Sequence, residues 1–172
     1  MFGSPVALGS LHVVEPFDCG QAPLNIYLKQ YAGQNERRGG SRTYVIAGRD
    51  SRVVGYYTLA VGSIEHANAP AVVSKGLGQY PIPVIILARL AIDKTIQGKG
   101  FGLALLKDAL KRTLNVSREV GVRAVLVHAK DQRARDWYKK AAGFIESPTD
   151  EFHLLLLIQE IEKMLSPKPT TR

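Results

Sequence analysis

The sequence is poor in cysteine and histidine, which excludes several kinds of site. Cys19 is the single cysteine among 172 residues, so the chain can form neither an intrachain disulfide nor a thiolate metal cluster. The histidines, His12, His66, His128 and His153, lack the spacing of metal ligands. We therefore expect no disulfide framework and no metal site.

Long apolar runs are also missing. No run approaches the ~20 residues that a membrane-spanning helix needs, and "MFGSPVALGSLHVVEP" lacks the basic start and apolar centre of a signal peptide. We expect a soluble, cytoplasmic protein without a membrane partner.

Acidic residues are outnumbered, because 23 Lys and Arg against 15 Asp and Glu give a formal net charge of +8. Such an excess attracts polyanions such as nucleic acid or an acidic protein surface. A plain solvated surface explains the same balance equally well, so the charge alone does not identify a partner.

Hydrophobic patterning predicts alternating strands and helices within a single domain. In the first half we expect a strand over 12–17, a helix over 22–38 that stops at the glycines 39–40, a hairpin of strands over 41–48 and 53–65, and an irregular insert over 66–82. The helix over 22–38 is expected to bury Leu24, Tyr27, Leu28 and Tyr31. In the second half we expect a strand over 83–93, a helix after the glycines that follow, a strand over 121–129, a helix over 131–141 with Asp131 as N-cap, and a strand over 152–159 before a short charged tail.

The run over 83–93, "PVIILARLAID", is nearly all apolar, which is typical of a strand covered on both faces at the centre of a sheet. The next helix places one apolar face toward the core, and a strand follows it, as in a parallel strand–helix–strand unit. That face comprises Leu105, Leu106, Ala109, Leu110 and Thr113. The sequence thus predicts an α/β fold with helices flanking a central sheet.

Three glycines lie in "QGKGFG", residues 97–102, between this strand and this helix. The first turn of a helix has N–H groups without intrahelical partners, and bare backbone lets a phosphate approach them closely. A Walker loop is excluded because Lys99 is not followed by Ser or Thr. A dinucleotide fingerprint is excluded because the glycine spacing is G-x-G-x-G and the motif lies halfway along the chain.

The pattern that matches is Q-x-x-G-x-G, which resembles the acetyl-CoA loop of the GCN5-related N-acetyltransferases. The resemblance implies the GNAT acyl-CoA N-acyltransferase fold, with a mixed central sheet, as a single domain over 1–172 with its core at about 10–160. It also implies acetyl-CoA as co-substrate and no metal. The implied acetyl-CoA contacts are Leu90, Ile92, Gln97, Gly98, Lys99, Gly100, Phe101 and Gly102, with side-chain contacts from Gln97 and Lys99.

A narrower resemblance covers nearly the whole chain. Segments such as "CGQAPLNIYLKQYAGQNERRGGSRTYV", "PIPVIILARLAID" and "DWYKKAAGFIESPTD" are similar to the acetyltransferase toxins of bacterial type II toxin–antitoxin modules. That similarity implies acetyl transfer to the α-amine of aminoacyl-tRNA, which blocks translation. It further implies a ribbon-helix-helix antitoxin, binding of operator DNA only through that antitoxin, and a homodimer.

The resemblance places the proton donor for the leaving thiolate at Tyr138. Apart from the resemblance, His128 and His66 are possible general bases by residue type, although a lone histidine on a strand is more often a core residue, and His128 is the next candidate to supply the proton. Four residues separate Tyr138 from Gly143, where many family members have three, and Asp131 replaces an asparagine that is frequent in the family. We expect Trp137 to pack in the core.

Arg89 interrupts an apolar strand, and a buried charge without a partner is costly. It is expected to contact the acceptor end of tRNA or to form an internal salt bridge. Other basic residues could extend the track for the phosphate backbone, namely Arg37, Arg38, Arg42 and Lys75. Two alternatives remain open: acetylation of a small amine or a protein N-terminus, and a non-catalytic module that binds acetyl-CoA or nucleic acid.

Overall fold

The computed structural model describes residues 1–167. Its elements are β1 (Val6–Ala7), α1 (Ala22–Ile26), η1 (Tyr27–Tyr31), α2 (Ala32–Arg37), β2 (Arg42–Ala47), β3 (Val53–Ile64), η2 (His66–Asn68), α3 (Ala71–Ser74), β4 (Ile82–Ile92), η3 (Lys94–Ile96), α4 (Phe101–Ser117), β5 (Ala124–His128), α5 (Gln132–Ala142), β6 (Ile145–Glu146), β7 (His153–Leu157) and α6 (Ile158–Leu165). Across this described part of the chain, every helix is too short or too polar to span a bilayer.

The strands form one mixed sheet of seven, in the order β1-β2-β3-β4-β5-β7-β6. The apolar strand β4 is the middle one, as its sequence predicts. The chain divides into two compact units, Met1–Val61 with Ile86–Ala109, and Gly62–Ile85 with the described residues from Leu110 on. The predicted α/β fold class is confirmed.

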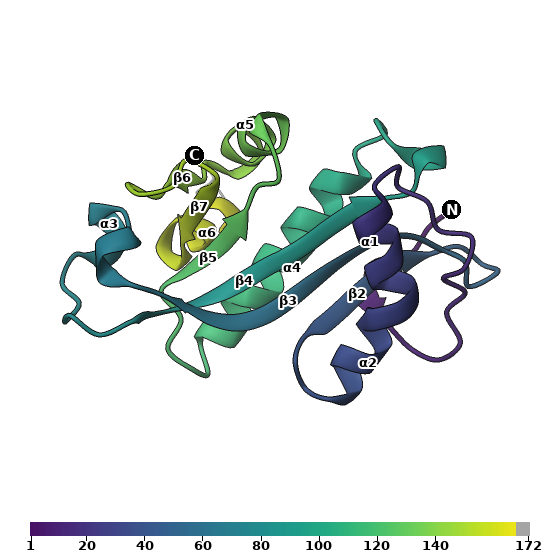
Figure 1. Ribbon diagram of the computed structural model, residues 1–172, viewed down its shortest axis with the longest axis horizontal. Helices are drawn as coiled ribbons and strands as arrows, with labels where there is room; N and C mark the ends of the chain where they lie inside the picture. The colour runs from purple at the N-terminus through teal and green to yellow at the C-terminus, as the bar shows by residue number, and fades with distance from the viewer. Residues whose placement is uncertain (168–172) are drawn as a thin grey trace. The chain divides into compact units, whose positions relative to one another are not determined.

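The first unit has a core between its helical segment and its strands. Figure 1 shows the purple ribbon of α1 and α2 in front of β2 and β3. Tyr27, Leu28 and Ala32 from the helical side pack with Val45 and Tyr56 from the strands. The predicted helix over 22–38 and its stop at the glycines are therefore confirmed, since the last turn ends at Arg37.

The middle of this helical segment, η1, is a π-helix, which changes the residues that face the core. Its closing hydrogen bond runs from the Ala32 N–H to the Tyr27 carbonyl, five residues apart. Ala32 is therefore fully buried in the position that α-helical spacing assigns to Tyr31. The prediction that Tyr31 is buried is wrong, because 49% of its surface is exposed.

The hairpin predicted over 41–65 is confirmed, with β2 antiparallel to β3. Thr43 and Thr58 lie opposite each other, and their buried hydroxyls are 3.0 Å apart. Gly55 on β3 allows a close approach, because a Cβ there would lie 2.8 Å from Cδ1 of Ile92 on β4. The insert over 66–82 contains the short helices η2 and α3, as expected of an irregular segment, and its last residue, Ile82, already begins β4.

The second unit contains β5, β6 and β7 beside α5, the green and yellow end of the ribbon in Figure 1. β7 is antiparallel to both β5 and β6. Asp131 is the N-cap of α5, and its side chain accepts a hydrogen bond from the Ala134 N–H at 2.8 Å. The residues predicted for the apolar face of α4 are all buried, namely Leu105, Leu106, Ala109, Leu110 and Thr113.

Two predicted strands differ from the structure. Residues 12–17 form only an isolated bridge from Val13 to Arg52, because the chain bends where the Phe17 N–H bonds to the Val14 carbonyl. The first strand is instead β1, paired with β2. The last predicted strand ends at Leu157, and α6 follows it with Ile161 fully buried, so residues 158–165 belong to a helix rather than to a strand and tail.

Candidate active site

Asp93 fixes the point where β4 leads into the glycine loop. Its buried carboxylate accepts hydrogen bonds from the Asp18 N–H at 3.0 Å and from the Thr95 N–H and hydroxyl at 2.9 and 2.7 Å. Burial raises the pKa of this carboxyl, but these hydrogen bonds outweigh it, so the pKa lies below its ordinary value. Asp93 is therefore ionised at neutral pH and holds η3 at the end of the strand.

Gln97 ties the loop to two other segments. Its amide nitrogen donates to the Ile92 carbonyl at 2.8 Å and to the Cys19 carbonyl at 3.0 Å. Both N–H donors of the amide are used within the fold, so the predicted side-chain contact with pyrophosphate is left to Lys99. What Gln97 retains for a ligand is its backbone N–H.

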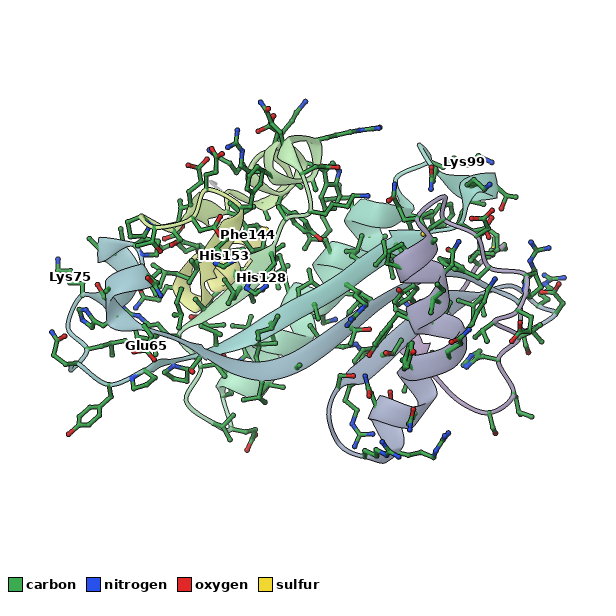
Figure 2. All side chains as sticks on the ribbon, in the orientation of Figure 1. Glu65, Lys75, Lys99, His128, Phe144 and His153 are labelled. Carbon is green, nitrogen blue, oxygen red and sulfur yellow. The ribbon has the colours of Figure 1, made fainter. Side chains whose placement is uncertain are left out.

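The loop glycines adopt backbone conformations that favour glycine. Gly98 has φ 74° and Gly100 has φ 86°. A Cβ built at either position would meet no heavy atom within 4 Å, so the space over this backbone is open. Lys99 between them is exposed, and Figure 2 shows it on the loop that precedes α4.

The loop ends at the first turn of α4, a helix of 17 residues with no acidic residue in that turn. The N–H groups of such a turn lack intrahelical partners and lie at the positive end of the helix dipole. Phe101 opens the turn and packs edge-on against Phe2, with 5.4 Å between ring centroids. Open backbone, a lysine and a helix N-terminus together are suited to the pyrophosphate of CoA.

Leu90 and Ile92 lie on the last residues of β4. Leu90 is half-buried, whereas the Ile92 side chain is directed at Gly55 and is buried. The side chain of Ile92 therefore belongs to the core, and any contact that it makes with a ligand comes from its backbone.

Arg89 lies on the same face of β4 as Ala91, a member of the core cluster that contains Tyr27 and Tyr56. Its guanidinium carbon is 3.6 Å from the centroid of the Tyr27 ring. Within residues 1–167 Arg89 forms no ion pair and donates no hydrogen bond, so the alternative of an internal salt bridge is not observed. Stacking on an aromatic ring is a pairing that no local sequence pattern indicates.

The turn from α2 to β2 contacts the tyrosine on which this arginine stacks. The Tyr27 hydroxyl and the Ser41 hydroxyl are 3.0 Å apart. Arg37 and Arg38 are exposed at the end of α2, and Arg42 is exposed and pairs with Glu36 at 3.2 Å. The three predicted basic residues thus flank the turn whose Ser41 contacts Tyr27, whereas Lys75 lies after α3 in the second unit.

Tyr138 lies on α5, with its ring packed edge-on against Phe144 at 5.5 Å and Trp137 at 4.9 Å. Burial raises the pKa of its hydroxyl well above the ordinary value, so the group stays protonated at neutral pH. The four residues after it continue the helix, which ends where Gly143 adopts φ 75°. Trp137 is 37% exposed, so the prediction that it packs in the core is wrong.

His128 and His153 lie opposite each other on β5 and β7, and their stacked rings are 4.2 Å apart (Figure 2). His153 lies 3.4 Å from the Asp150 carboxylate. Burial and the neighbouring His153 lower the pKa of His128, and Asp150 opposes them only in part. His128 therefore stays a candidate base. Its partner could not be found from sequence, because only the pairing of the strands brings His153 to it.

The chain resembles proteins of known activity over nearly its whole length. It is 41% identical to a tRNA-acetylating toxin of Mycobacterium tuberculosis over 164 residues, which cover 95% of this chain and 97% of that protein. Its fold matches that of AtaT complexed with acetyl-methionyl-tRNAfMet, with a TM-score of 0.88, 28% identity and coverage of 96% of this chain and 100% of that one.

A tyrosine-to-phenylalanine mutant of KacT matches with a TM-score of 0.84 and 28% identity, covering 90% of this chain and 92% of that one. Residues 8–144 match the sequence profile of the acetyltransferase (GNAT) family, a range that includes the glycine loop and Tyr138. The chain therefore belongs to the acetyltransferase (GNAT) family.

Proposed function

We propose that this protein is the toxin of a type II toxin–antitoxin module and transfers acetyl from acetyl-CoA to the α-amine of aminoacyl-tRNA. The observation that carries the proposal is the 41% identity to a tRNA-acetylating toxin over 95% of the chain. The family match over residues 8–144 runs through both compact units, which supports one N-acetyltransferase domain. Acetylated aminoacyl-tRNA blocks translation, and the protein would therefore act in the cytoplasm.

Acetyl-CoA would be held by the glycine loop. The backbone N–H groups from Gln97 to Gly102 and the Lys99 ammonium bind the pyrophosphate, aided by the N-terminus of α4. The backbone of Leu90 and Ile92 on β4 pairs with the pantetheine arm and the acetyl carbonyl. Gly98 and Gly100 allow this because their open backbone leaves room for the phosphates.

Tyr138 would act as the general acid. The α-amine of an amino acid has a pKa of about 7.7–8.0, and that of its ester is lower, so enough is neutral at pH 7 without a strong base. The leaving sulfur needs a proton, and the Tyr138 hydroxyl, whose pKa burial raises, is protonated at neutral pH and so able to donate. The Tyr138 hydroxyl gives its proton to the sulfur as the C–S bond breaks, the nitrogen loses one proton to water as the amide forms, and Tyr138 is then reprotonated from water.

Arg89 would bind the phosphates at the acceptor end of the tRNA, and other basic residues would extend this contact along the backbone. Phosphate contacts of this kind position the nucleic acid without reading its sequence. The residues proposed for the extension are Arg37, Arg38, Arg42 and Lys75.

The proposed partners are a ribbon-helix-helix antitoxin, operator DNA bound through that antitoxin, and a second copy of the chain as a homodimer. A tyrosine-to-phenylalanine mutant of AtaT has been solved bound to the C-terminus of the antitoxin AtaR, and a KacTA–DNA complex is known. Both structures match 95% of this chain, which supports the same kind of assembly here.

Labelled acetyl-CoA incubated with total aminoacylated tRNA tests the proposal. We expect label in the RNA fraction that is released with the amino acid when the ester is hydrolysed, and none with deacylated tRNA. Label found only on small amines or on protein N-termini would support the first alternative. Binding of acetyl-CoA without turnover on any amine would support a non-catalytic module.

A further inference from the structure

We propose that Tyr27 is a positioning residue, which holds the Arg89 guanidinium in the orientation that receives a tRNA phosphate. The inference rests on the proposed function. It gives a part in that function to Tyr27, whose spacing in the sequence predicts only that the residue is buried in the core. It follows from three features of the first unit: the stacked pair, the free donors of Arg89 and the fixation of the Tyr27 ring.

The stacked pair leaves the donors of Arg89 available. A guanidinium 3.6 Å from a ring centroid is well within the range of a cation–π contact, in which the ring takes one face of the cation. The N–H groups lie in the plane of the guanidinium, so stacking does not consume them. Within residues 1–167 these N–H groups have no hydrogen-bond acceptor, and Arg89 is half-buried. A tRNA phosphate can therefore accept two parallel hydrogen bonds from a guanidinium whose orientation is already fixed.

The Tyr27 ring is itself fixed on several sides. Its hydroxyl lies 3.0 Å from the Ser41 hydroxyl and accepts a hydrogen bond from the Asn35 amide at 3.3 Å. Its ring is stacked with Tyr56 at 6.4 Å between centroids, and the Tyr56 hydroxyl donates to the Leu24 carbonyl at 2.8 Å. Only 4% of Tyr27 is exposed.

The backbone of η1 contributes to the same fixation. Tyr27 is the first residue of the π-helix, and its carbonyl accepts the hydrogen bond that closes the wide turn. π-Helical turns inside α-helices are frequent at functional sites. The η1 backbone thus helps to fix the Tyr27 ring, and the ring in turn holds the Arg89 guanidinium on the face of β4.

The test measures the KM for total aminoacylated tRNA and kcat separately. Tyr27→Leu keeps an apolar side chain but removes the π face, and we expect KM to rise about tenfold, while kcat and the Kd of acetyl-CoA stay near wild type. Tyr27→Phe keeps the ring and should restore KM to within about threefold. Tyr31→Leu, the same substitution at an exposed tyrosine of η1, is the matched control and should behave as wild type.

Arg89→Lys tests the same contact from its other side, at a half-buried rather than a buried residue. It keeps the charge but not the plane that stacks, so we expect KM to rise about fivefold. In an Arg89→Gln background, Tyr27→Leu should add less than about twofold, because the ring would have no guanidinium to hold.

Three results would overturn the inference. The KM of Tyr27→Leu could equal that of wild type, or the KM of Arg89→Lys could equal that of wild type. The third is a KM increase in the Tyr27→Leu, Arg89→Gln double variant that equals the product of the increases in the two single variants. If Tyr27→Leu does not fold, Arg89→Lys decides. If the wild-type protein neither acetylates nor binds tRNA, the proposed function fails and the inference fails with it. If wild-type acetylation is intact and only the KM predictions fail, the inference alone is wrong.

Discussion

The Tyr138 hydroxyl has no hydrogen-bond partner within residues 1–167, although only 9% of the residue is exposed. Tyr138→Phe therefore removes no stabilising contact that the structure shows. We expect kcat on aminoacyl-tRNA to fall roughly 10²-fold or more, as for loss of a general acid. The melting temperature and the Kd of acetyl-CoA should barely change, as measured by calorimetry.

Tyr80→Phe is the matched control for this variant, because it is the same substitution at a tyrosine that is 83% exposed. Its turnover should equal that of wild type. Wild-type turnover in Tyr138→Phe would mean that water or His128 supplies the proton, and His128→Gln would then separate these two possibilities.

Gly100 is the residue at which the loop backbone is expected to approach a phosphate. A valine at φ 86° is strained and also fills the open space above the backbone. We expect Gly100→Val to raise the Kd of acetyl-CoA by about tenfold or more, measured by isothermal titration calorimetry. Gly76→Val introduces the same strain at φ 77°, also with no atom within 4 Å, and should leave that Kd unchanged. Equal effects of the two valines would show that strain, rather than a lost pyrophosphate contact, weakens binding.

At the scale of the element, the link from β4 to α4 depends on the Asp93 carboxylate. Asp93→Asn would set an amide donor against the Asp18 N–H, so we expect the free energy of unfolding at pH 7 to fall by about 1–3 kcal/mol. The folded-state pKa of Asp93 lies below the unfolded value of about 3.9. Its stabilisation is therefore complete above about pH 4 and disappears as the pH falls through the folded-state pKa.

Urea unfolding of both proteins at several pH values measures this difference. The gap between wild type and Asp93→Asn should narrow below about pH 4. Asp136→Asn, which changes an exposed carboxylate on α5, should unfold like wild type at neutral pH. A gap that stays constant down to about pH 2 would exclude the ionised form of Asp93 as the source of the stabilisation.

Elements with strong periodicity were predictable from sequence. The apolar run of β4, the glycines after it and the buried face of α4 follow from local pattern, and so does the N-cap at Asp131. The π-helical turn was not predictable, because no spacing distinguishes Tyr31 from Ala32 until tertiary packing selects one of them. Residues 12–17 have strand composition, but only Val13 bonds across to a neighbouring strand segment, while the His12 and Phe17 N–H groups bond within turns.

The candidate site was predictable only where it is local in sequence. The glycine loop is one continuous segment, so its residues were found together. The contact of Arg89 with Tyr27 joins β4 to η1, and that of His128 with His153 joins β5 to β7, so each needs the folded chain. Gln97 was assigned to the loop correctly, but its amide is used for the Ile92 and Cys19 carbonyls, which no motif indicates.

At the scale of the whole molecule, the net charge of +8 and the proposed basic residues predict a steep salt dependence. Raising monovalent salt from about 50 to 200 mM should lower kcat/KM for aminoacyl-tRNA roughly 10²-fold, because each phosphate contact releases counterions. The Kd of acetyl-CoA, which carries few charges, should change by less than about tenfold.

Two arginine variants sharpen this measurement. Arg37→Gln should reduce the slope of log kcat/KM against log salt by about one, if it contacts a phosphate. Arg118→Gln, an exposed arginine outside the proposed set, should leave the slope unchanged. A salt dependence no steeper for tRNA than for acetyl-CoA would argue against a polyanionic acceptor.

The Cys19 carbonyl that accepts from Gln97 belongs to the single cysteine of the chain, and that residue is shielded from solvent, with only 8% of its surface exposed. The reactivity of the Cys19 thiol can therefore be used to follow opening at the proposed acetyl-CoA loop. The Cys19 side chain packs in the core cluster with Phe17 and Tyr27, so a thiol reagent reaches the sulfur only when the segment around Cys19 opens. Because the carbonyl of the same residue holds Gln97, we expect the labelling rate to report how frequently this segment and the loop come apart. Saturating acetyl-CoA should slow labelling at least about tenfold by stabilising the closed form, and Gly100→Val should raise the acetyl-CoA concentration that gives half of this protection by about tenfold or more.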